Sequence, residues 1–359
     1  MFSRTTKIYE LIRKLGVVKH KKRQEFLVNI IEGVIKSRSV LFSEIADKID
    51  KPILTESIER RIQDFFQKVS FDYKHLLKFL LSFVDHDDLT LSIDRTEWDF
   101  GELSVNVLCV VVSIGKMGVP IYFEMLDNNS GNSNSENRID LFKDLIEVVG
   151  IERIALLLMD REFIGCNWLS WLKQKGILFC VRVPKHHKIT FADGERKTAT
   201  ELLEENDQYP LSLENVCVDR VCLNVKLWYN QQGELFYLIG TIPVRELSKA
   251  YKKRWTIEVI FQAFKGRGFN MEESCLRCLK KYKKLFGIVS MAYTLCWATG
   301  IQQGKTKPVR TKKHGYPQYS VFRRGLNLVR DFFKGRACKA LEEALVNANY
   351  RIAKFNFLI

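Results

Sequence analysis

The spacing of apolar side chains along this sequence changes from helical to extended and back to helical. Residues 1 to about 85 carry apolar side chains at helical intervals, as in QEFLVNIIEGVI and FDYKHLLKFLLSF. From Leu89 the interval becomes that of strands, in the segments LTLSID, NVLCVVVSIG and VPIYFEML. A turn from Gly115 to Gly118 joins the last two. The three segments therefore predict an antiparallel meander.

Helices and strands alternate in the next part of the chain. The polar segment DNNSGNSNSEN is either a disordered linker or, more simply at this length, a loop at the edge of an active site. A helix capped by Ser135 follows and runs to about Val149, and the apolar segment IALLLMD then predicts a buried central strand. A helix from about Cys166 to Lys175 and the strand ILFCVRV complete the series. The order β-β-β-α-β-α-β predicts a ribonuclease-H-like α/β fold, a mixed sheet covered by helices.

The residues after the fifth strand interrupt this core and then return to it. Two strand-like segments follow, VCVDRVCLNVKLWY and ELFYLIGTI. The next segment, SKAYKKRWTIEVIFQAFKGRG, begins at Ser248 and is strongly helical until Gly266 and Gly268; we call it the SKAY helix. We therefore expect a helical domain, a first part of the core, a β-rich insertion, a second part of the core with the SKAY helix, and a basic helical C-terminal region. Their expected bounds are 1–85, 86–183, 184–246, 247–300 and 301–359.

The charge of the chain indicates a polyanionic partner. Its 57 Lys and Arg against 42 Asp and Glu give a formal net charge of +15 and a pI of about 9.3. Nucleic acid is the leading candidate. Acidic membrane lipid is the alternative, but the longest apolar stretch, from about Leu285 to Ala298, contains Gly, Ser and Thr and is too short to span a bilayer, so we expect a buried helix and no membrane. Lys305 to Arg336, with ten basic residues and one acid, is either a DNA-contacting surface or a solvated region.

The N-terminal helical domain contains the outline of a helix-turn-helix. A short amphipathic helix from Phe42 to Ile49 precedes a turn with Pro52 and a second helix capped by Thr55 or Ser57. A plain helical bundle with a solvated basic face explains the same pattern. In the first interpretation this is a DNA-binding domain, and the polar residues that face outward from the second helix contact DNA: Arg60, Arg61 and Gln63.

The cysteines and tryptophans suggest packing more than chemistry. Nine cysteines scattered through predicted strands and helices do not form a disulfide framework. Cys275 and Cys278 have the spacing of half a zinc site, but no second pair lies at a suitable distance, so a helix face that packs small side chains is the simpler interpretation. Trp98 and Trp255 are expected in the core. The N-terminus, MFSRTTKIYELIRK, has no secretory h-region, which predicts a cytoplasmic protein.

Two aspartates follow predicted neighbouring strands. Asp94 ends the first strand and Asp160 ends the apolar fourth strand. In a sheet of the predicted order these strands are adjacent, so their carboxylates can converge at one edge. Oxygen ligands are those that hard divalent cations prefer. Taken singly, each aspartate is more typical of a turn or a helix cap than of a metal ligand.

The SKAY helix offers a third carboxylate. At about 100° per residue, four of its polar side chains fall within an arc of roughly 60°. These are Tyr251, Arg254, Glu258 and Lys265. Apolar residues occupy the far side and would be buried: Ile257, Ile260, Ala263 and Phe264. A solvated stripe with intrahelical Arg-to-Glu pairing would look the same.

The pattern Y-x2-R-x3-E-x6-K formed by these four residues resembles the signature of the DDE transposases of bacterial insertion sequences, in the group named for those letters. Three further blocks are similar to the same family: Asp94 to Trp98, Met159 to Gly165, and Gly268 to Glu272. The resemblance runs from about residue 89 to 300, with the motifs in the family's order.

The resemblance implies a metal-dependent enzyme that cleaves DNA and transfers strands, in cut-and-paste transposition. Asp94, Asp160 and Glu258 would be catalytic and would hold two Mg²⁺ ions, with Mn²⁺ as a substitute. The substrates would be double-stranded DNA, namely terminal inverted repeats and a target. Further residues would contact DNA: Tyr251, Arg254 and Lys265 at phosphates beside the cut, with Arg161 and Arg95 as secondary candidates.

The resemblance also implies a role for the insertion and for assembly. Trp228 would stack on an unpaired base, although packing within the insertion explains it equally well. A homodimer is expected in the DNA complex, in a bacterial cytoplasmic protein associated with the nucleoid. The chain ends about 90 residues after Lys265, so a long C-terminal oligomerisation domain is not expected.

Two other functions remain compatible with these residues. A catalytically inactive, transposase-derived DNA-binding protein would keep the basic surfaces, although the presence of all three acids argues against it. A ribonuclease-H-like nuclease would cut DNA and never join it. Strand-transfer products separate the second alternative from a transposase.

Overall fold

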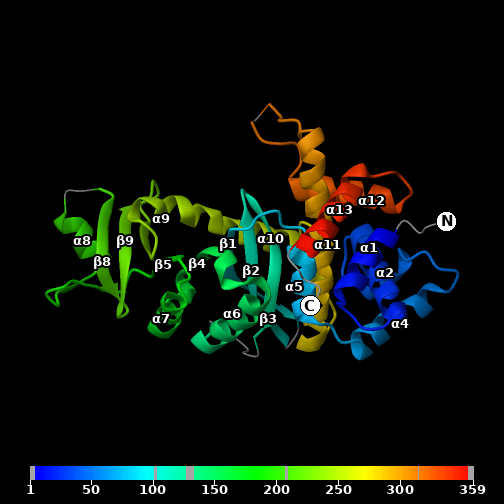
Figure 1. Ribbon diagram of the computed structural model, residues 1–359, viewed down its shortest axis with the longest axis horizontal. Coiled ribbons are helices and arrows are strands. Elements are labelled where there is room, and N and C mark those ends of the chain that lie inside the picture. Colours follow the sequence, from blue (N-terminus) through cyan, green and yellow to red (C-terminus); the bar gives the residue numbers. More distant parts are fainter. Residues whose placement is uncertain (1–4, 101–102, 127–132, 207–208, 314, 355–359) are drawn as a thin grey trace.

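The strands of the protein form one mixed sheet that runs through most of its length. The computed structural model describes residues 5–100, 103–126, 133–206, 209–313 and 315–354. Within these residues the sheet has ten strands in the order β3-β2-β1-β4-β5-β10-β9-β8-β6-β7. Figure 1 shows an elongated molecule in which the sheet runs from one end through the middle, while helices form the other end.

The first five strands make the predicted ribonuclease-H-like core. They are β1 (Leu89–Phe100), β2 (Leu103–Ile114), β3 (Met117–Met125), β4 (Ile154–Met159) and β5 (Phe179–Arg182). β1, β2 and β3 pair antiparallel, while β4 pairs parallel with both β1 and β5. The meander, the central position of β4 and the order of elements are therefore confirmed.

Alternating side chains of the central strands are buried on opposite faces of the sheet. Leu158 of β4 belongs to a small apolar cluster with α9 (Val244–Tyr251). Its neighbour Met159 belongs to the main core, where its sulfur accepts a hydrogen bond from Trp168 Nε1 of α7 (Cys166–Gln174). α6 (Ser135–Val149) packs against α7. The two helix layers lie along the upper and lower sides of the view in Figure 1.

The β-rich insertion extends the core sheet. Strand β10 (Leu235–Gly240) pairs antiparallel with β5, and β9 (Val221–Tyr229) and β8 (Leu211–Val218) continue the sheet outward. Two short strands, β6 (Ile189–Thr190) and β7 (Arg196–Lys197), form the far edge, next to α8 (Ala199–Glu205). The insertion is thus tied by backbone hydrogen bonds to the strand that follows β4.

The N-terminal part is helical, as predicted. Its helices are α1 (Thr6–Leu15), α2 (Lys21–Ser37), α3 (Phe42–Asp47), α4 (Thr55–Lys68) and α5 (Tyr73–Leu81). α3 and α4 correspond to the predicted helix pair, but the capping prediction is wrong: α4 begins after Leu54, with no side-chain cap. The cap predicted at Ser135 is also wrong, because Asn134 caps α6 in a capping box with Asn137.

One long helix passes between the sheet and the N-terminal helices. α11 (Leu279–Thr306) packs on β3, α2, α12 (Val321–Phe333) and α13 (Lys339–Lys354). It is long and apolar enough to cross a membrane, so the expectation that this stretch is too short is wrong. However, 89% of its most apolar window is buried inside the protein, which confirms the predicted buried helix.

The predicted continuous SKAY helix is broken in the structure. α9 ends at Tyr251, a 3₁₀ turn covers Lys252–Arg254, and α10 (Trp255–Phe264) follows. Ser113 Oγ of β2 lies 3.4 Å from the carbonyl oxygen of Lys253, so the turn is held against the sheet. α10 packs on β1, β2 and β3. Its predicted apolar face is buried as expected, with Ile257 and Ile260 fully covered.

Candidate active site

The sheet directs two aspartates toward the same helix layer. Ile93 and Met159 form the last pair of the β1–β4 ladder, and Asp94 and Asp160 are the next residues of their segments. Because side chains alternate, both acids point away from the α7 side. The prediction that Asp94 ends its strand is wrong: β1 continues to Phe100, since β2 goes on pairing with it beyond the end of β4.

Arg254 brings all three predicted acids together. Its Nη1 lies 2.8 Å from Asp94 Oδ2, and its Nη2 lies 3.4 Å from Glu258 Oε1 and 3.6 Å from Asp160 Oδ2. The guanidinium is buried, with only 8% of the side chain exposed. Sequence reasoning gave Arg254 a DNA phosphate as its partner, but in the structure its partners are the acids themselves. The 3₁₀ turn makes this possible by pointing Arg254 into the sheet.

Close packing fixes the helix that carries Glu258. Gly118 of β3 lies under the start of α10, and a Cβ at this position would come within 2.7 Å of Thr256 Cγ2 and 2.3 Å of the Val112 carbonyl oxygen. Glycine therefore allows α10 to approach the sheet. Glu258, two residues after Thr256, remains partly exposed, with 35% of its side chain accessible. The acid is consequently anchored at its backbone and open at its carboxylate.

Tyr251 connects the end of α9 to the second aspartate. Its hydroxyl donates a hydrogen bond to Asp160 Oδ1 at 3.0 Å. Burial, and then the charge of Asp160, raise the pKa of Tyr251, so the phenol remains protonated and acts as a donor. The same residue packs on the apolar cluster of Leu158. Tyr251 thereby fixes one oxygen of Asp160.

The pKa of Asp94 is strongly raised. Burial raises the pKa of Asp94 from its ordinary 3.8 to about 7, and Glu258 and Asp160 add to the effect. Arg254 and the backbone N–H of Arg95 act in the opposite direction. Burial lowers the pKa of Arg254, but Asp160, Tyr251 and Asp94 raise it by more, so the guanidinium stays charged. One buried cation therefore only partly compensates three carboxylates.

The donor set fits a hard divalent cation, with Arg254 supplying positive charge at the same point. Three carboxylates from separate elements offer the oxygen ligands that Mg²⁺ and Mn²⁺ take. Among the residues that the structure describes, no three His, Cys, Asp or Glu side chains are grouped closely enough to hold a metal ion. The guanidinium holds the acids, Asp94 through Nη1 and both Asp160 and Glu258 through Nη2. Their chemistry fits the cation, and Arg254 would have to yield its contacts.

Each of the three further predicted cations is held by a described neighbour. Lys265 Nζ lies 3.2 Å from the carbonyl oxygen of Glu97 and 3.1 Å from Glu272 Oε1. Arg161 pairs with Glu234 at 2.8 Å. Arg95 pairs with Glu97 and, at 3.3 Å, with Glu162. These side chains thus pair with residues other than the three acids, although the backbone N–H groups of Arg95 and Arg161 donate to Asp94 Oδ1 and Asp160 Oδ1, each at 2.8 Å.

The structure adds supporting residues that sequence reasoning missed. Arg138 of α6 is buried and donates from Nη2 to the carbonyl oxygen of Glu162 at 2.8 Å, which fixes the turn after Asp160. Burial lowers the pKa of Arg138 to about 10. Glu234 bridges Arg161 and Arg182, and these two arginines, Arg182 first, lower its pKa. The one indication of this network in the sequence is that Glu162 lies in the same motif as Asp160, two residues after it.

The tryptophans divide differently from the expectation. Trp98 is buried as predicted, but Trp255 is 62% exposed, so its placement in the core is wrong. The reason is the 3₁₀ turn, which rotates the start of α10. Trp228 is partly buried and stacks on Phe236 at 4.9 Å, with the rings 20° apart, against the cluster that includes Tyr251. Of the two alternatives given for Trp228, this contact corresponds to packing within the insertion.

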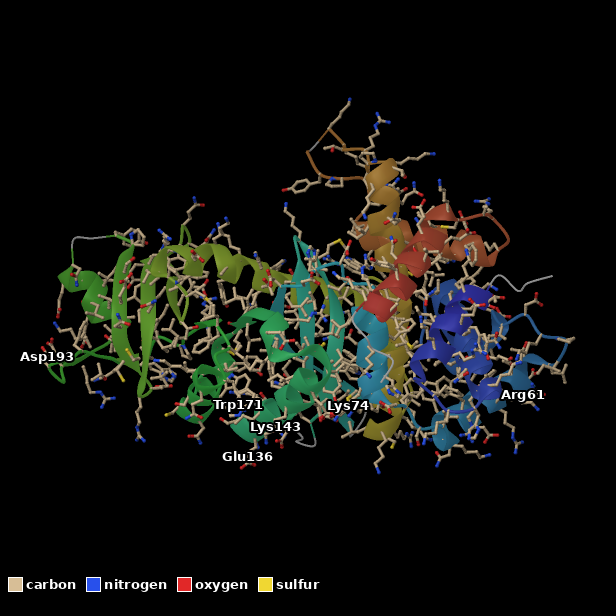
Figure 2. The ribbon with its side chains drawn as sticks, viewed as in Figure 1. Arg61, Lys74, Glu136, Lys143, Trp171 and Asp193 are labelled. Atoms are coloured by element: carbon tan, nitrogen blue, oxygen red, sulfur yellow. The ribbon has the colours of Figure 1, made fainter. Side chains whose placement is uncertain are left out.

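Outside this site, the predicted DNA-contacting helix is exposed where expected. Arg60, Arg61 and Gln63 of α4 all face solvent, and Figure 2 labels Arg61 at the helical end of the molecule. Gln63 lines a groove of about 590 Å³ whose wall also carries Arg277 and Lys281. Cys275 and Cys278 are exposed, so the expected packing of their side chains is wrong. The segment around them is extended where a helix was expected.

Residues 85–295 match the family model described as Transposase DDE domain, and this segment includes Asp94, Asp160 and Glu258. No curated protein sequence matches the chain. The cryo-EM structure of the piggyBac transposase synaptic complex with hairpin DNA is similar with a TM-score of 0.44 and 12% identity, over 92% of this chain and 76% of that chain. A likeness of that size supports no inference. Because the family model covers more than half of the sequence, the chain belongs to the transposase DDE domain family.

Proposed function

We propose that this transposase binds the terminal inverted repeats of an insertion sequence and catalyses metal-dependent cleavage and strand transfer, with Asp94, Asp160 and Glu258 as its catalytic residues. The observation that carries the proposal is the convergence of these three acids on one guanidinium. They come from three separate elements, β1, the end of β4 and α10, which the β1–β4 pairing and the packing of α10 on the sheet bring to one point. The Y-R-E-K group of bacterial transposases is the proposed subgroup.

The acids would hold two Mg²⁺ ions, with Mn²⁺ as a substitute. Bound to the three carboxylates, such a pair supplies an activated oxygen nucleophile and stabilises the leaving 3′ oxygen of the phosphodiester. Asp94, the most buried acid, is rigidly held in a strand paired on both sides up to Ile93. Asp160 is oriented by Tyr251, and Glu258 approaches from the helix layer.

Arg254 would keep the acids together in the free protein and contact a DNA phosphate in the complex. Its guanidinium can make bidentate contacts with carboxylate and with phosphate alike. In the free protein it neutralises charges that would otherwise repel one another. When DNA is bound, a phosphate beside the cut would offer the same two-point partner. Arg254 would thus exchange one anion for another.

The remaining cations would position the DNA around the cut. Lys265, with 29% of its side chain exposed, would reach a phosphate as a point charge. Arg161 and Arg95 would approach from the turn after β4 and from β1. Arg60 and Arg61 would contact the DNA farther from the acids. Cut-and-paste transposition requires two transposon ends held together, so we also propose a homodimer on DNA, in the cytoplasm of a bacterial cell.

The test is a cleavage and joining assay on the DNA that flanks the gene, which should carry imperfect inverted repeats. The wild-type protein with Mg²⁺ is expected to nick the repeat end and to produce joined strands. Asp94→Asn, Asp160→Asn and Glu258→Gln should each lower cleavage at least about 10³-fold while leaving the DNA shift intact, because they remove ligands and no DNA-facing cation.

Two outcomes would replace the proposal with another function. A wild-type protein that shifts the DNA but never cuts it would be an inactive, transposase-derived DNA-binding protein. One that cuts but gives no joined product would be a nuclease. Cleavage that survives substitution of any of the three acids would contradict their assignment.

A further inference from the structure

The segment from Ser274 to Arg330 contains 13 Lys and Arg and no Asp or Glu. Part of it forms a short hairpin between α11 and α12, described at residues 307–313 and 315–319, which we name the basic hairpin. Its backbone is closed by hydrogen bonds from Gln318 N to Arg310 O and from Lys312 N to Tyr316 O, both at 2.9 Å. Figure 1 shows it standing out from the molecule beyond the end of α11.

The basic hairpin presents its charges to solvent. Its cations are Lys307, Arg310, Lys312 and Lys313, which are all exposed, and none of them forms an ion pair with a carboxylate of the described residues. Tyr316 and Tyr319 are 71% and 46% exposed beside them. A two-stranded hairpin without an apolar core is only marginally stable alone, and like charges repel within it. Such a surface is stabilised by a polyanion.

The hairpin stands on the side of the molecule where the site's helices lie. In Figure 1 it projects upward, and α9 and α10, which carry Tyr251 and Glu258, run along the same upper side. α6 and α7 line the opposite side. A duplex that reaches the acids from this side would extend toward the hairpin.

We propose that the basic hairpin is a second DNA-binding element, which holds duplex DNA through its phosphates independently of sequence. This rests on the proposed function in that DNA is the substrate. Lysine and arginine contacts to phosphate fix the position of a duplex but read no bases, and tyrosine hydroxyls do the same. The partner is therefore DNA outside the terminal repeat, as flanking or target duplex. A second copy of this chain is a poorer partner because it carries a net charge of +15 itself.

The test compares two lysine triplets in a binding assay without divalent ions. Lys307, Lys312 and Lys313 are changed together to Gln. The matched control changes Lys143, Lys173 and Lys175 to Gln, which are exposed lysines of the α6–α7 side; Figure 2 labels Lys143 there. Affinity for a fluorescent 30-base-pair duplex of arbitrary sequence is measured by anisotropy at several KCl concentrations. EDTA is present throughout, so that no cleavage occurs.

The hairpin triplet should weaken binding about tenfold or more at 0.1 M KCl and reduce the slope of log K against log salt by about 2 to 3, since each lost phosphate contact removes about 0.9. The control triplet should leave the slope nearly unchanged. A third variant, with Lys307→Arg, Lys312→Arg and Lys313→Arg, keeps the positive charge and should bind DNA like the wild type. Thermal denaturation of all variants establishes that they are folded.

Equal slopes for the hairpin and control triplets would overturn the inference. The inference would also be overturned if the hairpin triplet kept its DNA affinity but changed its oligomeric mass in the absence of DNA. The hairpin would then bind a second copy of the chain. These failures are separate from a failure of the proposed function. If the wild type cleaves and joins DNA but the hairpin triplet binds DNA normally, only the inference about the hairpin is contradicted. If the wild type never cleaves DNA but the hairpin triplet loses affinity for it, only the proposed catalytic function is contradicted.

Discussion

The substitution Asp94→Asn should stabilise the free protein, although it removes a proposed catalytic residue. The pKa of Asp94 is raised by burial from 3.8 to about 7, even with Arg254 2.8 Å away. A tenfold change in acidity corresponds to about 1.4 kcal/mol, so the ionised carboxylate destabilises the folded state by about 4 kcal/mol. Asparagine has nearly the same shape and carries no charge. The attraction of Arg254 is already contained in that figure.

The sign of the effect depends on pH in a defined way. Below pH 3.8 Asp94 is protonated in both the folded and the unfolded state, and the substitution should be neutral. Between pH 4 and 7 the unfolded state loses its proton first, so the wild type becomes progressively less stable than the variant. The gain in the free energy of unfolding should be about 2 kcal/mol at pH 5 and reach about 4 kcal/mol by pH 8.

Urea denaturation in EDTA at pH 5 and pH 8 measures this difference. Asp88→Asn is the matched control, since it removes the same charge from an exposed position six residues earlier and should change stability by less than about 0.5 kcal/mol. Two results would refute the view that burial raises the pKa of Asp94. One is an Asp94→Asn variant that is no more stable than the wild type at pH 8. The other is a difference in the free energy of unfolding that is the same at pH 5 as at pH 8. The result also bears on the cleavage assay, because a stabilised variant that cannot cut has not lost activity by unfolding.

Three other substitutions test the supporting contacts. Arg254→Ala should destabilise the metal-free protein by about 2 kcal/mol at pH 8 in the same urea experiment, less than a fully broken buried pair because Asp94 can take up a proton; no loss of stability would contradict the three ion pairs. Tyr251→Phe, which removes the hydrogen bond to Asp160, should lower the cleavage rate about 10- to 100-fold with unchanged DNA affinity, and an unchanged rate would show that the hydroxyl does not orient Asp160. Gly118→Ala should destabilise the fold by about 1–3 kcal/mol and lower the melting temperature, because its Cβ would clash with Thr256 and Val112; a stable variant would mean that α10 can move off the sheet.

The core could be predicted from the sequence where apolar periodicity decides the structure. The meander of β1 to β3 and the apolar strand β4 have patterns that only a sheet satisfies. Strand ends were less predictable: β1 continues past Asp94 because β2 pairs with it, which is a property of the neighbour. The extension of the sheet by β10 also depends on pairing between distant segments, and no local pattern reports it.

The partners of the site residues could not be predicted from spacing on an ideal helix. The 3₁₀ turn at Lys252–Arg254 changes the rotation between Tyr251 and Glu258, and with it the directions of Arg254 and Trp255. Its stabilisation comes in part from Ser113, which is 140 residues away in sequence. The exposure of Trp255 and the burial of Arg254 are two results of the same turn.

The difference between Asp94 and Arg254 indicates which part of the site can adapt. Asp94 belongs to a strand that β2 pairs along its length and β4 up to the preceding residue, so its backbone cannot move without breaking sheet hydrogen bonds. Arg254 reaches the acids with a long side chain from a turn between two helices. A change of charge at this site must therefore be met by the guanidinium, because rotation about its side-chain bonds costs far less than unpairing a strand. This asymmetry is the physical basis for proposing that Arg254 exchanges carboxylate for phosphate while the three acids keep their places.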